Sequence, residues 1–197
     1  MNETYTSTKH RDFFENIYGT LFYPNDTFDE LKQDPPILEA LGIVVAISIL
    51  TPLINMSVPT TQNIIFFIYI LFTAAISGII KWVFFAAFVE AVASIFKNGG
   101  KMKQFLTLSA FALLPWIFIG PVTLLKTGGI FASLLGILFG LAIWIWTTLL
   151  TILAAMKAYE ISSGRVLLLV AIPLIGCIIF FNWIVGFFET LMQIFKL

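Results

Sequence analysis

The apolar stretch IIFFIYILFTAAISGIIKWVFFAAFVEAVASIF, residues 64–96, decides what kind of fold this chain can adopt. As a single helix it would extend roughly 50 Å. About twenty helical residues are enough to cross the ~30 Å hydrocarbon core of a bilayer. The stretch is therefore longer than one crossing requires, yet too short for two crossings and a turn. It predicts one long helix that spans a membrane and projects beyond its inner face.

Four further apolar stretches flank this helix, so the sequence predicts an all-α, polytopic membrane protein with five transmembrane helices. The approximate bounds of all five are 37–57, 64–96, 105–125, 130–156 and 166–188. Prolines fall inside several of them: Pro52 near the end of the first, Pro115 and Pro121 in the third, and Pro173 in the fifth. Because proline removes a helical hydrogen bond, we expect the third segment to be broken.

The composition supports this class and divides the chain in two. Hydrophobic residues make up 59% of the 197 residues, too large a share for a water-soluble domain. Most of the acidic residues lie in the first 39 positions, so we expect a short head over residues 1–36 and a transmembrane domain over residues 37–197. The zero net charge argues against a nucleic-acid partner. One cysteine, Cys177, and one histidine, His10, are too few to hold a metal, and we expect no cofactor.

Lysine and arginine predict the orientation, because these residues resist transfer across the membrane. With the N-terminus inside, only Lys126 and Lys196 lie outside, and Lys81 lies within the second span. The inner side then holds Lys9, Arg11, Lys32, Lys97, Lys101, Lys103, Lys157 and Arg165. We therefore expect a cytoplasmic N-terminus and a C-terminus on the outside.

The head contains signals for two short helices. Apolar residues recur at helical spacing from Phe13 to Phe22, which predicts an amphipathic helix. That helix can lie in the membrane interface or pack on the inner loops of the protein itself, and the sequence favours neither. Thr27 and Glu30 have the spacing of a capping box ahead of Leu31, so a second short helix that ends before Pro35 is expected.

Two charged residues lie inside the second span, where a charge costs about 2.5–3.5 kcal/mol. Lys81 and Glu90 are nine positions apart, on roughly opposite helix faces, and should not pair with each other. We expect Glu90 to form an ion pair with Lys157. Asn182, or carbonyls freed by Pro115, could bond Lys81; the alternative is that Lys81 extends its ammonium group to the inner interface.

Small residues recur every four positions near the start of the fourth span, a pattern that lets another helix approach closely. They are Gly128, Ala132, Gly136 and Gly140. We expect this groove to serve packing within the protein, with dimerisation as the alternative. The sequence has no Gly-x-Ser-x-Gly or His-Glu-x-x-His motif, so it predicts no enzyme.

The inner loop and its surroundings resemble the Yip1 domain family. The resemblance rests on Glu90, on Phe96-Lys97-Asn98-Gly99-Gly100, and on Ala110-Phe111-Ala112-Leu113-Leu114-Pro115. Segment 160–165, followed by Pro173, and the entry into the first span also fit. The likeness runs from about residue 22 to the end. It implies five spans, a cytoplasmic N-terminus, a Gly-Gly inner loop and a proline in the third span.

The resemblance also implies a class of function. Eukaryotic members act in transport between endoplasmic reticulum and Golgi, through partner proteins and Rab-type GTPases rather than by catalysis. This chain lacks their long Pro/Gly-rich tail and their Asp-Leu-Tyr-Gly-Pro-type motif, and has only Tyr18-Gly19-Thr20-Leu21. It is more similar to the short prokaryotic members. We therefore do not expect GTPase binding, and we expect the cell membrane, with endoplasmic reticulum or Golgi as the alternative.

Two functions from different classes remain open on the sequence. The first is a non-enzymatic membrane protein that acts by associating with lipids, with itself or with other membrane proteins, in membrane organisation or a trafficking-like role. The second is a small transporter, channel or lipid-moving protein with a polar cavity around Lys81 and Glu90. A cavity that reaches Lys81 would favour the second, and a dry, packed bundle would favour the first.

Overall fold

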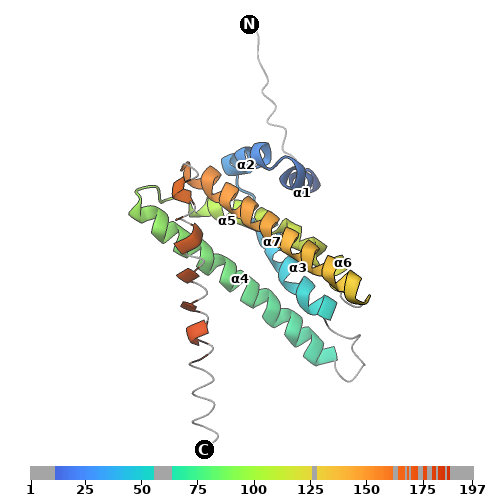
Figure 1. Ribbon diagram of the computed structural model, residues 1–197. Helices are drawn as coiled ribbons and strands as arrows, with labels where there is room; N and C mark the ends of the chain where they lie inside the picture. The colour runs from blue at the N-terminus through green and yellow to red at the C-terminus, as the bar shows by residue number, and fades with distance from the viewer. Residues whose placement is uncertain are drawn as a thin grey trace, which may run out of the picture.

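The structure, a computed structural model, describes residues 12–55, 64–125 and 128–161, together with individual residues between 164 and 186. All regular elements within these described residues are helical (Figure 1). They are α1 (Phe13–Phe22), α2 (Pro24–Gln33), α3 (Ile37–Asn55), α4 (Ile64–Ile95), α5 (Met102–Ala112), the 3-10 helix η2 (Leu114–Phe118), α6 (Ile119–Leu125) and α7 (Ile130–Tyr159).

Four stretches of the described chain are long and apolar enough to cross a membrane. They are Ile37–Ile54, Ile64–Ile95, Met102–Leu125 and Ile130–Tyr159. These match the first four predicted spans, and the 32 residues of α4 form the single long helix that the sequence predicts. The predicted fifth span, 166–188, lies partly outside the described residues, and Pro173 is among those left out; the residues described there are helical.

The third span is broken as expected, at one of its two prolines. Pro115 lies in η2, which separates α5 from α6, because proline cannot continue the α-helical hydrogen-bond ladder. Pro121 lies within α6, which continues past it to Leu125. The span also begins earlier than predicted, with α5 starting at Met102.

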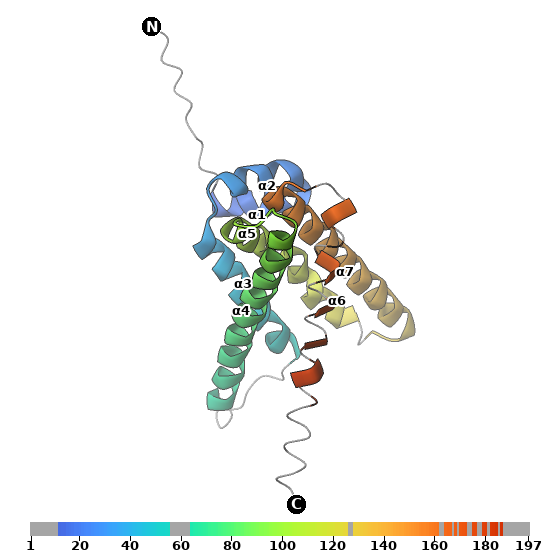
Figure 2. The ribbon, with the colours of Figure 1, turned by 90° about the vertical axis from the view of Figure 1, so that its left-hand side faces the viewer.

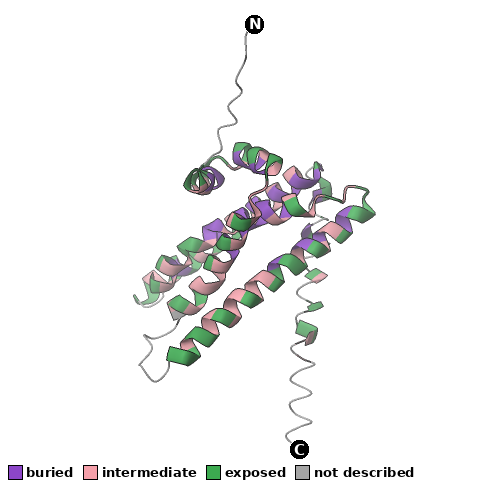
Figure 3. Ribbon diagram, turned by 180° about the vertical axis from the view of Figure 1, so that it is seen from behind, coloured by how far each residue is buried: buried purple, intermediate pink, exposed green. Residues whose placement is uncertain are grey.

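Helices α1 and α2, here called the N-terminal helix pair, lie together at one end of the bundle (Figures 1 and 2). The same end holds the last residues of α4 and α7. Helix α3 packs against α4 and α5, and α7 packs against α5 and α6. Burial is greatest toward the helix-pair end, whereas the opposite halves of α4 and α7 are largely exposed (Figure 3). Apolar side chains exposed in this way are suited to lipid.

The helix pair belongs to the main hydrophobic core. Phe28 and Leu31 of α2 are buried among residues of α5 and α7, including Phe105 and Tyr159. The capping-box spacing at Thr27 does not mark the start of α2, because the helix begins at Pro24, and its end at Gln33 lies before Pro35 as expected. Proline suits a first helical position, where its missing N–H would have no intrahelical partner in any case.

Candidate functional site

Glu90, near the end of α4, is hydrogen-bonded through both oxygens of its carboxylate. Its Oε2 accepts a hydrogen bond of 2.9 Å from the hydroxyl of Tyr159, the last residue of α7. Its Oε1 accepts a hydrogen bond from the backbone N–H of Gly100 in the following loop. One carboxylate therefore joins two long helices and a loop. We call Glu90, Asn98, Gly99, Gly100, Tyr159 and Glu160 the α4–α7 junction.

The loop of the junction has a specific backbone shape. Asn98 N–H donates to the Ala93 carbonyl and Lys97 N–H to the Ser94 carbonyl, both at 3.0 Å. This is the Schellman pattern at a helix end, with Lys97 in the left-handed position at φ 61°. The Asn98 side-chain amide then donates to the Tyr159 carbonyl at 3.1 Å. The loop is thus bonded to the end of α7 as well as to α4.

Both glycines of the loop are needed for different reasons. A Cβ on Gly99 would lie 2.2 Å from Ser94 Oγ and 3.0 Å from Glu90 Oε1, so there is no room for a side chain. Gly100 has space around it, but its φ of +88° is unfavourable for residues that carry a Cβ. The Gly-Gly pair therefore lets the loop approach Glu90 and present an N–H to it.

Ion pairs connect the junction to the N-terminal helix pair. Glu160, just beyond α7, accepts from Lys32 of α2 at 2.8 Å and from Lys101 at 3.3 Å. Hydrogen bonds from these two ammonium groups hold the pKa of the Glu160 carboxyl below its ordinary value. The two ion pairs thus stabilise the fold above the unfolded-state pKa and are lost as the pH falls through the lower folded-state pKa. Lys157 forms a further pair with Asp29.

The predicted ion pair between Glu90 and Lys157 is wrong. Lys157 pairs with Asp29. The two oxygens of Glu90 accept hydrogen bonds from Tyr159 and from Gly100, respectively. Lys157 and Tyr159 are two positions apart, which is a rotation of about 200° around α7, so their side chains lie on nearly opposite faces of the helix. The face of α7 toward α4 therefore carries the phenol, and the face toward α2 carries the lysine. A search for opposite charges does not reveal a neutral donor such as the Tyr159 hydroxyl.

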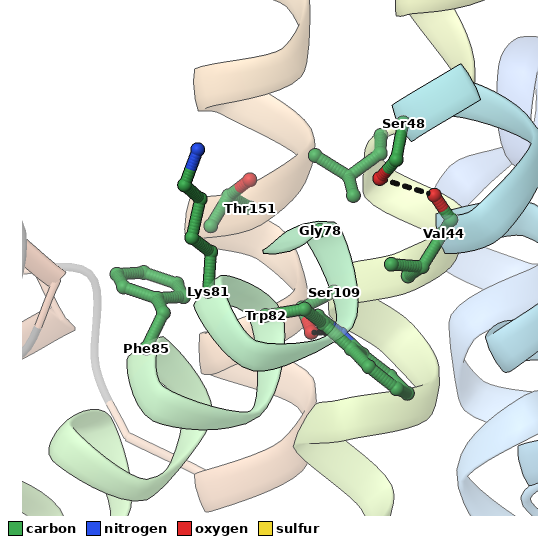
Figure 4. Close-up of a pocket in the computed structure, with 9 residues that line it drawn as sticks. Val44, Ser48, Gly78, Lys81, Trp82, Phe85, Ser109 and Thr151 are labelled. Atoms are coloured by element: carbon green, nitrogen blue, oxygen red, sulfur yellow. Dashed lines mark hydrogen bonds between the residues drawn. The ribbon is translucent and has the colours of Figure 1, made fainter. Parts of the chain in front are cut away.

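Lys81 lies apart from the junction, at a cavity between α3, α4, α5 and α7. The cavity has a volume of about 240 Å³, and its lining includes Ser48, Gly78, Lys81, Trp82, Ser109 and Thr151 (Figure 4). Glu90 is not among the lining residues. The Lys81 side chain is exposed, and no hydrogen bond or ion pair joins it to any described residue, Asn182 included. Asn182 is helical and exposed.

The small-residue groove is only partly in α7. Gly136 is buried, and a Cβ on Gly140 would touch Val122 of α6 at 3.9 Å, so these positions face another helix of the same chain. Ala132 is half-buried on the same helix. Gly128 precedes α7 and is exposed. A closer approach occurs elsewhere, at Gly78 of α4, where an added Cβ would meet Ser48 of α3.

No three His, Cys, Asp or Glu side chains come together as a metal site among the residues that the structure describes. The acidic groups of the junction are bonded to donors of the protein itself. The arrangement is thus that of a structural connection between helices.

Comparison with known proteins adds one finding. The model of the Yip1 domain family matches residues 18–184, most of the chain. No curated protein and no solved structure gives a significant match. The matched region begins within α1 and includes the whole junction and the cavity at Lys81.

Proposed function

Because this chain belongs to the Yip1 domain family, we propose that it is a non-enzymatic integral membrane protein that acts by associating with other proteins or with lipids. The observation that carries this proposal is the state of its polar groups at the junction. Glu90 and Tyr159 bond each other and the loop, and Glu160 bonds Lys32 and Lys101. These groups hold the helix pair and bundle together, and none forms a paired acid and base facing a cavity.

The surface offered for association is one face of α1. Phe14, Tyr18 and Phe22 follow each other at intervals of four and are 78%, 57% and 60% exposed. With Tyr23, 61% exposed, they form what we call the α1 aromatic face. The opposite face of α1, with Phe13, Ile17 and Leu21, packs against the protein core. Helix α1 is thus held by the core while its aromatic side chains remain available to a membrane interface or another protein.

We expect loss of the α1 aromatic face to remove association. The test is chemical crosslinking and native mass spectrometry of the full chain in lipid, comparing wild type with a variant that carries Phe14→Ser, Tyr18→Ser and Phe22→Ser. The wild type should retain a protein partner, a second copy or lipid, and the variant should lose most of it. Phe131→Ser, which alters an 81% exposed aromatic side chain at the start of α7, is the matched control and should behave as wild type. A wild-type monomer that retains neither protein nor lipid would contradict the proposal.

We propose further that the chain crosses the membrane five times, with the N-terminus in the cytoplasm and the C-terminus outside. The distribution of cations supports this. Lys32, Lys101 and Lys157 gather at the end of the bundle that carries the helix pair. A cluster of lysines at one end of a membrane bundle favours the cytoplasmic side. The prokaryotic cell membrane is the proposed location, and endoplasmic reticulum or Golgi the alternative.

Labelling of single cysteines in intact cells tests this topology. In a chain made cysteine-free by Cys177→Ala, a cysteine at position 129 and one added after Leu197 should react with a membrane-impermeant thiol reagent. A cysteine at position 7 should react only after the cells are opened. Four crossings instead of five would place the added C-terminal cysteine on the same side as position 7, and its protection would refute the fifth span.

One observation favours the second candidate function, a small transporter, channel or lipid-moving protein. The cavity of about 240 Å³ reaches Lys81, as that function requires. The cavity does not include Glu90, which belongs to the junction and not to the cavity lining. Among the described lining residues, a ligand would therefore meet one charged side chain, Lys81.

A further inference from the structure

The cavity at Lys81 differs from the rest of the described interior because it combines an apolar wall with one cation. Val44, Phe85 and Leu113 contribute apolar wall, and Gly78 and Ser48 also line the cavity (Figure 4). The volume of about 240 Å³ lies just below the ~300–1,000 Å³ of typical small-molecule sites. The cavity therefore fits part of a larger ligand whose remainder lies outside it.

Each hydroxyl group that lines the cavity already donates a hydrogen bond to a backbone carbonyl. Ser48 donates to the Val44 carbonyl at 2.7 Å, and Thr151 to the Thr147 carbonyl at 2.8 Å. Ser109 donates to the Leu106 carbonyl at 3.0 Å and accepts from the Trp82 indole N–H at 3.1 Å. Of the polar lining side chains, only Lys81 retains donors that no described group accepts.

Lys81 lies far from both ends of α4, where an ammonium group without a described acceptor is unfavourable. It lies roughly 21 Å from the Ile95 end of the helix and roughly 25 Å from the Ile64 end, at 1.5 Å per residue. A side chain leaves an α-helix tilted toward its N-terminal end, which for Lys81 is the end farther from the helix pair. Reaching the inner interface would require the side chain to turn back, and a charge left in hydrocarbon is unfavourable.

We propose that the cavity at Lys81 binds an anionic membrane lipid. Oxygens of the acid group, a phosphate or a carboxylate, accept hydrogen bonds from the Lys81 ammonium group, and part of an acyl chain fills the apolar cavity. Charge complementarity selects the acid group, and the remaining lining groups offer it no competing donor. Lipid-facing side chains of α4 lie beside the cavity, with Ile80 and Val83 58% and 39% exposed, so a lipid can enter from the bilayer.

The proposal deepens the second candidate function by naming its ligand, but it requires binding only, not transport. It is also independent of the α1 aromatic face, because Lys81 and that face lie on different helices with no shared residues. A wild-type chain that associates with protein but shows no saturable binding of anionic lipid would refute the lipid site alone. The reverse result would refute the association role alone.

Quenching of Trp82 fluorescence by brominated lipid tests the site. The full chain is reconstituted in phosphatidylcholine nanodiscs, with Trp116, Trp144, Trp146 and Trp183 changed to Phe so that Trp82 alone reports. Phosphatidylglycerol brominated on its acyl chains should quench saturably, and Lys81→Gln should weaken its apparent affinity about tenfold or more, as expected for loss of a charge-assisted hydrogen bond. Lys103→Gln, which removes another exposed lysine, should change it less than twofold.

A second variant separates the cavity from the charge. Thr151→Phe fills the cavity while keeping Lys81, and it should also abolish saturable quenching. Native mass spectrometry of the chain with all its tryptophans provides a second measurement, in which phosphatidylglycerol adducts should persist in wild type and disappear in Lys81→Gln. Equal quenching by brominated phosphatidylcholine, or unchanged binding in a folded Lys81→Gln variant, would overturn the proposal and leave Lys81 as a side chain that extends to the interface.

Discussion

Replacing Glu90 with alanine should destabilise the folded chain by about 3 kcal/mol, because two hydrogen bonds to a charged acceptor are worth ~1.5–3 kcal/mol each. The substitution leaves the Tyr159 hydroxyl and the Gly100 N–H without their acceptor. It also removes the only described bonded contact between the end of α4 and the phenol that ends α7. Reversible unfolding in SDS from mixed micelles, followed by circular dichroism, measures the change in the free energy of unfolding.

Two milder variants show whether the carboxylate acts through these two bonds. Tyr159→Phe removes one of them, and Glu90→Gln keeps an acceptor for one donor while offering an amide to the other. Each should lose roughly half the effect of Glu90→Ala, about 1.5 kcal/mol. In a double-mutant cycle, Glu90→Ala and Tyr159→Phe should lose less together than the sum of their separate losses. Strictly additive losses would mean that the hydroxyl bond contributes nothing.

The hydrogen bond between Glu90 and Tyr159 that this cycle tests could not be predicted from the sequence. The bounds of the long apolar helices follow from hydropathy and length, which is why the 32-residue α4 agrees with prediction. The break at Pro115 follows instead from the missing N–H of proline. Charge and spacing in the sequence do not show which neighbouring helix each face of α7 contacts. The prediction therefore placed Glu90 and Lys157 together, although the helix rotation between Lys157 and Tyr159 turns the lysine toward Asp29 instead.

The ends of helices escaped prediction for a related reason. The capping box at Thr27 was overridden by Pro24, since a proline at a first helical position competes with any later cap. At the end of α4, Lys97 takes the left-handed position usually given to glycine, while the two glycines that follow serve packing and loop shape. Local signals identified the right residues, but tertiary contacts decided which residue does what.

The groove of small residues illustrates the limit most clearly. A spacing of four drew attention to Gly136, which is buried, and to Gly140, which faces Val122 of α6. Among the glycines that the structure describes, the tightest contact instead involves Gly78, set against Ser48 of α3, and in its own helix Gly78 has only Ala74 at the same spacing. Periodicity within one helix does not reveal which residue of a second helix lies opposite, so Ser48 could not be identified as the neighbour of Gly78.

Gly78→Ala should destabilise the chain by about 2 kcal/mol through overpacking between α3 and α4. The added Cβ would lie 1.8 Å from Ser48 Oγ and 2.6 Å from Ser48 Cβ. Rotating the hydroxyl away relieves only the first clash, because the second involves an atom fixed to the backbone. The helices must therefore separate, and the cavity that Gly78 and Ser48 both line would change with them. SDS unfolding measures the loss of stability.

Removing the side chain of Ser48 should restore the stability lost in Gly78→Ala if the clash between these two residues is the cause. In the variant with both Gly78→Ala and Ser48→Gly, the nearest Ser48 atom still present would be its Cα at 3.9 Å, an ordinary contact. The double variant should thus be no less stable than Ser48→Gly alone, whose own cost is a helix-propensity loss of about 1 kcal/mol. Gly42→Ala in α3, with nothing within 4 Å, is the matched control and should be neutral or stabilising. If Ser48→Gly failed to rescue Gly78→Ala, close α3–α4 contact could not explain the need for glycine at this position.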